Sequence, residues 1–290
     1  MLTLEATPVV PARAELAEGP VWDADRGLLW WVDITPGLVH ALDPVGGADR
    51  SYPIGRPVGS VALRRDGTLL VATDDGFSAL DPATGALGTI LARPAEAPPR
   101  ANDGKCDPRG RFLVGRVGLH SAAGQGGLYR LDEDLTLTPL LDGLTIPNGL
   151  AWRSDGREMY FIDSPRRAVT AYGYDPSNGE LGEGRQLGGR VSDGEPDGMT
   201  IDADDCLWVA VWGGSRVMRL SPEGDLLMTI SVPASRTTSC TFGGPDLDEL
   251  YITTARQGLS PDELAREPLA GSLFRVRPGV KGVLPVPFAA

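Results

Sequence analysis

Basic residues are scarce in this chain of 290 residues, in which 27 Lys and Arg face 39 Asp and Glu and give a net charge of −12. Affinity for the phosphate backbone of nucleic acids requires clustered Lys and Arg, so a chain this acidic is a poor candidate for binding them. We therefore expect no nucleic-acid partner, and we expect the excess of acids to serve solubility.

Cysteine is scarce as well, and its three occurrences, Cys106, Cys206 and Cys240, lie far apart without any CxxC pair. This usage favours reduced thiols in a cytoplasmic protein over a disulfide framework. The N-terminal region lacks the basic start and apolar core of a signal peptide, and no apolar run approaches the roughly 18 residues of a membrane span. The expectation is a soluble cytoplasmic protein without a membrane partner, either a monomer or a weak dimer.

Glycine and proline, by contrast, are abundant, with 38 and 25 residues. Each costs a helix about 1 to 3 kcal/mol relative to alanine, so long helices are excluded. The apolar fraction of 41% is too high for a disordered chain. What remains is a globular protein with many short strands and turns.

Two strand-like elements recur along the chain. The first is a turn with Asp or Gly followed by a short apolar run, and the second alternates apolar and polar residues before Asp-Pro, Ser-Pro or Gly. The apolar runs are marked, at spacings of 40, 43, 47, 48 and 43 residues, by Trp30, Leu70, Leu113, Tyr160, Trp208 and Tyr251. Six such units predict an all-β fold, a six-bladed β-propeller with residues 1–290 as one domain. The alternative is a β-sandwich with fortuitous spacing.

Three segments fall outside the repeat. Residues 2–10 have no counterpart in the other units, so we expect this strand to pair with the last blade and close the ring. The Pro-rich segment 92–100 is expected to be a loop. Residues 258–271 are expected to hold a short helix capped by Ser260, with Pro261 in its first turn.

Polar residues recur where the first strand of each unit enters the predicted central channel. The equivalent positions in the six units are Glu18, Gly59, Asn102, Asn148, Asp197 and approximately Thr238. Asn or Asp at one such position is explained by a turn. In a propeller, however, four carboxylate or amide side chains would converge on one axis, where a cation offsets their charge and desolvation. Oxygen ligands suit calcium or magnesium. The two histidines and the cysteines show no spacing typical of zinc.

Six motifs occur in order between about residues 15 and 278: AEGPVWD, RANDGKCDPRGRF, TIPNGLAW, EPDGMTID, LWVAVWGG and FGGPDLDELYITTAR. Together they resemble the senescence marker protein, regucalcin and gluconolactonase family. The resemblance implies a six-bladed propeller that holds one divalent cation and hydrolyses sugar lactones.

The resemblance also implies roles for individual residues. It implies three metal ligands, which are Glu18, Asn148 and Asp197, the last of them also the general base. It implies three substrate-binding residues, which are Arg100, Asn102 and Asp103. Some members similar to regucalcin have a sugar-contacting glutamate after the second strand of the third blade, where this chain has His120. His120 is therefore either a substrate contact or an exposed loop residue.

Lactone hydrolysis requires a polarised carbonyl, an activated water and a stabilised oxyanion, and a bound dication serves all three needs. The implied activity is that of a gluconolactonase-like lactonase acting on glucono-, xylono- or arabinolactone through a metal-activated water, with Asp197, or Asp103 beside it, as the base. Calcium is the expected cation, and magnesium, manganese, zinc and ferrous iron stay as alternatives. Two other functions remain open: an organophosphate or ester hydrolase on the same propeller, and a non-catalytic calcium-binding regulator.

Overall fold

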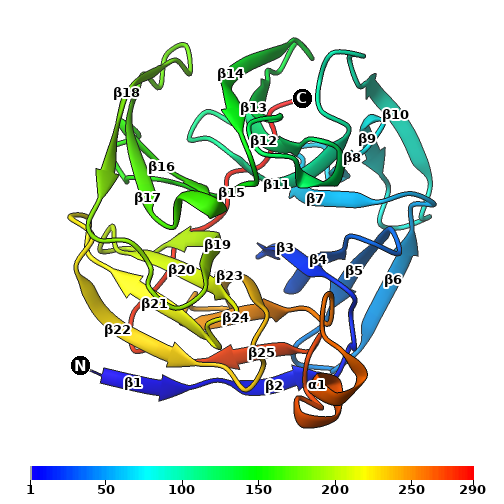
Figure 1. Ribbon diagram of the computed structural model, residues 1–290. Helices are drawn as coiled ribbons and strands as arrows, with labels where there is room; N and C mark the ends of the chain where they lie inside the picture. The colour runs from blue at the N-terminus through cyan, green and yellow to red at the C-terminus, as the bar shows by residue number, and fades with distance from the viewer. Residues whose placement is uncertain (1) are drawn as a thin grey trace.

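The computed structural model describes residues 2–290 and contains six sheets arranged as blades around a central axis (Figure 1). Within each blade the four principal strands pair antiparallel with their neighbours in the sheet. The first strand of each blade lies next to the axis and the fourth lies at the periphery (Figure 1). The predicted all-β six-bladed propeller is confirmed.

Blade 1 contains β3 (Ala17–Asp23), β4 (Leu28–Asp33), β5 (Leu38–Leu42) and β6 (Asp49–Pro53). Blade 2 contains β7 (Val58–Leu63), β8 (Leu69–Thr73), β9 (Gly76–Leu80) and β10 (Leu87–Ala92). Blade 3 contains β11 (Arg100–Cys106), β12 (Phe112–Val117), β13 (Gly126–Leu131) and β14 (Leu137–Leu144). Blade 4 contains β15 (Pro147–Trp152), β16 (Glu158–Asp163), β17 (Val169–Tyr174) and β18 (Leu181–Leu187). Blade 5 contains β19 (Glu195–Ile201), β20 (Leu207–Trp212), β21 (Arg216–Leu220) and β22 (Leu226–Ser231). Blade 6 contains β23 (Thr237–Gly243), β24 (Glu249–Thr254), β25 (Leu273–Val276) and β2 (Thr7–Val10).

The two recurring sequence elements are the second and third strands of the blades. The apolar runs form the second strands because both faces of these strands are buried between neighbouring blades. In β4, for example, Trp30 and Val32 pack against blade 2, whereas Leu29 and Trp31 pack in the cluster shared with blade 6. Hydrophobic clusters of this kind lie between all six pairs of adjacent blades. The core is thus divided into six layers that hold the ring together.

The N-terminal segment joins two blades. β2 forms the outer strand of blade 6 by pairing antiparallel with β25, as predicted for the whole segment 2–10. β1 (Leu2–Glu5) instead pairs parallel with β22 and adds a fifth strand to blade 5. The prediction was therefore correct for only half of this segment. Since β2 comes from the start of the chain and β25 from near its end, their pairing closes the ring.

The short helices lie outside the blades. α1 (Pro261–Arg266) begins after Ser260, whose side chain accepts a hydrogen bond from the Glu263 amide in a complete capping box, as predicted. The 3₁₀ turns η1 (Leu119–Ser121) and η2 (Ser164–Arg166) follow the second strands of blades 3 and 4. The predicted loop at 92–100 is confirmed for residues 93–99. Within residues 2–290, no helix is long and apolar enough to cross a membrane.

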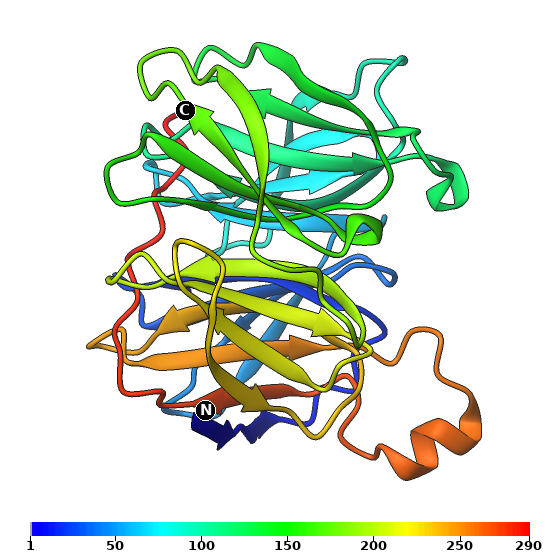
Figure 2. The same ribbon diagram turned by 60° about the vertical axis from the view of Figure 1, so that its left-hand side comes forward.

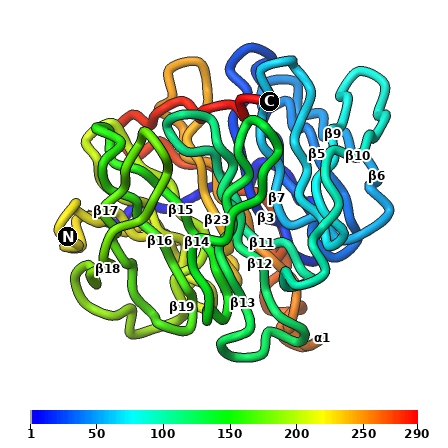
Figure 3. The backbone as a smooth tube through the Cα atoms, turned by 90° about the horizontal axis from the view of Figure 1, so that it is seen from above, coloured from blue at the N-terminus to red at the C-terminus, as the bar shows by residue number. Residues whose placement is uncertain are grey.

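The C-terminal residues 282–290, here called the strap, cross the face of the propeller opposite to α1 (Figures 2 and 3). The Gly282 amide donates to the Leu247 carbonyl at 2.8 Å, and the Phe288 amide donates to the Leu63 carbonyl at 2.7 Å. The strap therefore connects blade 6 to blade 2 across the central axis. The sequence did not predict it.

Candidate functional site

Every first strand is interrupted by a β-bulge at the level of the predicted site residues. The register shifts lie at or next to the six positions that the repeat made equivalent, which are Glu18, Gly59, Asn102, Asn148, Asp197 and Thr238. A bulge bends the strand and changes the direction of the local side chains, so bulges are frequent beside active sites. The structure confirms that these six residues are equivalent in the fold.

Glycine follows two of these residues for a steric reason. A Cβ atom on Gly198 would lie 2.1 Å from the Ser239 Oγ atom, and one on Gly149 would lie 2.7 Å from the Asp197 carbonyl oxygen. The first strands of neighbouring blades thus approach so closely that no side chain fits between them. The motifs Asn148-Gly149 and Asp197-Gly198 mark close strand packing and not a hairpin turn.

Gly198→Ala is expected to lower the free energy of unfolding by about 1 to 3 kcal/mol, because the added methyl group must displace β23 or β19. The same displacement moves the preceding Asp197, so the arrangement of polar groups around the channel is expected to change as well. Chemical denaturation measures the first effect. Gly189→Ala is the matched control, since a Cβ atom at Gly189 meets nothing within 4 Å. Equal stability of the two variants would contradict the close packing described above.

A pocket of about 490 Å³ lies where the first strands enter the channel, and it brings together five of the seven predicted site residues. These are Glu18, Arg100, Asn102, Asn148 and Asp197. The same pocket is walled by apolar side chains, which are Leu16, Ile34, Pro57, Ile146 and Trp212. A concave, partly apolar site with a few convergent polar groups is typical of small-molecule binding.

A relay of hydrogen bonds fixes the amide groups of this pocket. The Arg100 guanidinium donates to the Asn102 Oδ1 atom at 2.9 Å, and the Asn102 Nδ2 atom donates to the Asn148 Oδ1 atom at 2.8 Å. The Asn148 Nδ2 atom then donates to the Ser164 Oγ atom at 2.8 Å, which itself donates to the Pro196 carbonyl at 2.7 Å. The relay connects the first strands of blades 3, 4 and 5 and sets the orientation of both amides. Sequence reasoning missed Ser164, because only this blade has a serine directly after its second strand.

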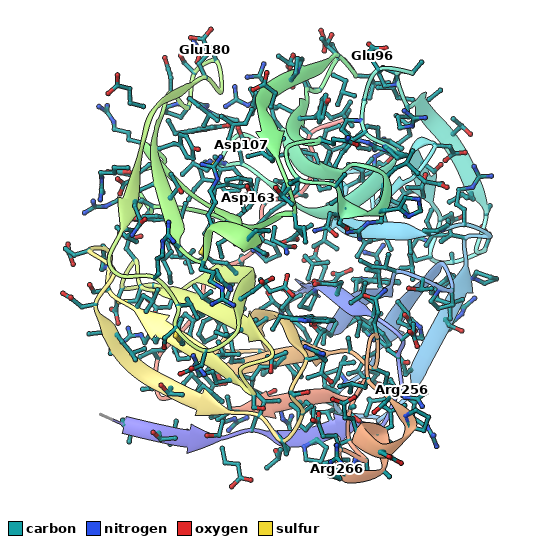
Figure 4. All side chains as sticks on the ribbon, in the orientation of Figure 1. Glu96, Asp107, Asp163, Glu180, Arg256 and Arg266 are labelled. Carbon is teal, nitrogen blue, oxygen red and sulfur yellow. The ribbon has the colours of Figure 1, made fainter. Side chains whose placement is uncertain are left out.

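Two aspartates outside the pocket hold the loops that form its wall. The Asp33 carboxylate accepts hydrogen bonds from the Leu16 amide at 2.9 Å and the Glu15 amide at 3.0 Å. Asp163 repeats the arrangement in blade 4, where it accepts from the Ile146 amide at 2.8 Å. Both aspartates end the second strand of their blade, and Asp163 lies in the interior, unlike the peripheral Glu180 (Figure 4). Buried carboxylates therefore fix the backbone at Leu16 and Ile146, two positions before Glu18 and Asn148.

The carboxylates of Glu18 and Asp197 are buried with only partial compensation from the protein. Burial raises the pKa of both groups, and their proximity to each other and to Asp103 raises the pKa of Asp197 further. The Glu18 carboxylate accepts one hydrogen bond, from the Gly19 amide at 3.0 Å, and none to Asp197 is formed by any described residue. Arg100 only partly opposes these effects, and burial lowers its own pKa. The pocket thus has a deficit of positive charge.

A divalent cation fits this deficit. Glu18 and Asp197 supply two negative charges and Asn148 supplies a neutral oxygen, which is a set of hard donors. The part of the chain that the structure describes contains no group of three His, Cys, Asp or Glu residues that could hold a metal. A set of two carboxylates and one amide is consistent with this, because the third donor is an asparagine.

Two predicted substrate contacts lie outside this pocket. Asp103 follows Asn102 but lines a second cavity of about 350 Å³, which the strap residues 283–286 border at the other end of the first strands. The bulge between Ala101 and Gly104 separates the directions of the two neighbouring side chains. His120 is exposed in η1, and the adjacent Ser121 lines the pocket instead. Neither residue lines this pocket, so direct substrate contact by Asp103 and His120 stays a prediction.

The chain is similar over its whole length to named proteins. A family model described as "SMP-30/Gluconolactonase/LRE-like region" matches residues 16–256. Regucalcin of Xenopus laevis is 40% identical, with 100% of both chains covered. A putative sugar lactone lactonase of Bacillus subtilis (strain 168) is 38% identical, with 99% of both covered. The crystal structure of a calcium-binding protein, regucalcin, from Agrobacterium tumefaciens matches with a TM-score of 0.95 at 27% identity, covering 100% of both chains. This chain belongs to the SMP-30, gluconolactonase and LRE-like family.

Proposed function

We propose that this protein is a metal-dependent hydrolase that opens sugar lactones to aldonic acids. The observation that carries the proposal is the pair of buried and only partly compensated carboxylates, Glu18 and Asp197, in a pocket that Arg100 and Asn102 also line. The name of the Bacillus subtilis relative, a putative sugar lactone lactonase, supports a lactone as the substrate.

Glu18, Asn148 and Asp197 would hold the cation, and calcium is our first choice because all three donors are oxygen atoms. When bound, a divalent cation polarises the lactone carbonyl and lowers the pKa of a water molecule. The two carboxylates balance its charge, so an uncharged lactone enters a site that is nearly neutral. The raised pKa values of both carboxylates without a cation support this assignment.

The residues of the chain perform the remaining steps. The Asp197 carboxylate has no hydrogen-bond donor among residues 2–290, so one of its oxygens is free to accept the proton of the attacking water. The Arg100 guanidinium uses one nitrogen for Asn102 and has others left to donate to the ring oxygens of the lactone and to the carboxylate of the product. The apolar walls, including Ile34 and Trp212, reduce access of bulk water.

Removal of divalent cations is expected to lower the hydrolysis of glucono-, xylono- and arabinolactone by about 100-fold or more, because carbonyl polarisation contributes several kcal/mol to catalysis. A pH indicator follows the acid released before and after chelation. Calcium, magnesium, manganese, zinc and ferrous iron are then added back separately. Full activity in protein shown by mass spectrometry to be metal-free would exclude the role of the metal. Parallel assays with phosphotriesters test the alternative ester hydrolase.

A calcium-binding protein without catalysis is the second candidate. The name of the Agrobacterium tumefaciens structure, a calcium-binding protein, supports it. The two functions differ in turnover: a calcium-binding regulator would bind the cation in calorimetry but open none of the lactones. Turnover of any one of them by the wild-type protein decides in favour of the hydrolase.

A further inference from the structure

Glu195 is a carboxylate in the pocket that accepts no hydrogen bond from any residue that the structure describes. It begins β19, two residues before Asp197, and its partly buried side chain lines the same pocket. Across residues 2–290, its carboxylate takes part in no hydrogen bond and no ion pair. Both of its oxygens are therefore free to accept hydrogen bonds from a ligand.

Glu195 adds a negative charge to a pocket that already holds the carboxylates of Glu18 and Asp197. A third carboxylate in one pocket increases repulsion and gains no partner among the described residues. A local conflict of this kind is characteristic of a functional position.

The neighbours of Glu195 indicate what kind of ligand it meets. Trp212 is its direct partner in the pairing of β19 with β20, so the two side chains project from the same face of the sheet. Trp212 also lines the pocket, and the Arg236 guanidinium lies over its ring at 4.9 Å from the centroid. Thr35 and Gln257, which line the same pocket, carry a hydroxyl and an amide. The pocket thus combines a large apolar surface beside Glu195 with several hydrogen-bonding groups.

A sugar ring has complementary chemistry, because it carries C–H groups together with hydroxyl donors on neighbouring carbons. A carboxylate with two free oxygens accepts hydrogen bonds from two such hydroxyls, and a charged acceptor makes them stronger. A lactone without hydroxyl groups cannot use these acceptors. A carboxylate of this kind would therefore distinguish polyhydroxylated lactones from simple ones.

We propose that Glu195 is a specificity-determining residue that binds the hydroxyl groups of the sugar lactone, next to the apolar wall formed by Trp212. The proposal rests on the proposed lactonase function and extends it to the choice of substrate. Its role differs from those of Glu18 and Asp197, because it acts on the hydroxyl groups and not on the reacting carbonyl.

The test compares Glu195→Gln with the wild-type protein on glucono-δ-lactone and on δ-valerolactone, which has the same ring without hydroxyl groups. We expect kcat/KM for gluconolactone to fall by about 10- to 100-fold, since a charge-assisted hydrogen bond to the substrate is lost. The value for δ-valerolactone should change by less than about threefold, because the variant leaves the reacting groups intact. Asp193→Asn, at an exposed position in the preceding loop, is the control and should change neither value.

Four results would overturn the proposal. Unchanged kcat/KM for gluconolactone would show that Glu195 does not contact the hydroxyls. An equal loss with both lactones, or weaker calcium binding in calorimetry, would place Glu195 in the metal site. If the wild-type protein opens neither lactone, the proposed function fails. Binding of gluconate and of 5-hydroxypentanoate to variant and wild type then tests the role of Glu195 independently of catalysis. A loss of gluconate affinity alone in the variant would uphold the role of Glu195, and equal affinities of variant and wild type would overturn it.

Discussion

Asp197→Asn is expected to lower kcat for lactone hydrolysis by about 10²- to 10⁴-fold, the range that a general base contributes. The variant keeps the shape of the side chain but loses the charge that balances a cation and the oxygen that accepts the proton of water. We also expect the metal-free variant to unfold at a higher temperature than the metal-free wild type. Burial and nearby carboxylates raise the pKa of Asp197, so the ionised group destabilises the fold at neutral pH.

Loss of activity together with a gain in stability is a combination that a merely damaged fold cannot produce. A pH-indicator assay gives kcat, and thermal unfolding after chelation gives the midpoint. Asp225→Asn removes an exposed carboxylate from a turn of the same blade and is expected to change neither quantity. Normal turnover by Asp197→Asn would remove Asp197 as the base. Asp103→Asn should have the smaller effect on kcat, because Asp103 lines the opposite cavity.

The fold was predictable because each blade keeps the same pattern of apolar and turn residues, although the sequences of the blades differ. The second strands are buried on both faces, so they appear as short continuous apolar runs after turn residues. The third strands alternate and end at turns. Counting back the same distance from the turn of each unit then predicts that Glu18, Asn148 and Asp197 are equivalent, and the bulges occur at these positions.

The orientation of single side chains was less predictable. Asn102 and Asp103 are neighbours in one motif, yet the bulge directs them to different cavities. Ser121 reaches the pocket and His120 does not, since η1 turns between them. Glu195 was not singled out either, because its significance depends on the absence of a partner, which only the packed structure reveals. A repeat specifies equivalent backbone positions and leaves these local directions undetermined.

The strap is expected to contribute strongly to the stability of the fold through its buried residue Phe288. Phe288 is completely buried in the cluster between blades 2 and 3, where Phe112 and Leu131 belong to the same cluster. Its amide and carbonyl groups also pair with blade 2, at Leu63 and Arg65. Phe288→Ala is therefore expected to lower the free energy of unfolding by about 3 to 5 kcal/mol, through lost burial and the cavity left behind.

Chemical denaturation measures this loss, and Leu284→Ala is the matched control. The Leu284 side chain belongs to the same strap but is 56% exposed, so its truncation should cost less than about 1 kcal/mol. Both variants should retain the wild-type kcat under conditions where they are folded, because the strap borders the cavity opposite to the pocket of the proposed active site. Similar stability of the two variants would contradict a large contribution of the Phe288 side chain to the free energy of unfolding. A selective loss of kcat in Phe288→Ala would instead show that the two ends of the channel are coupled, since residues of the first strands line both cavities.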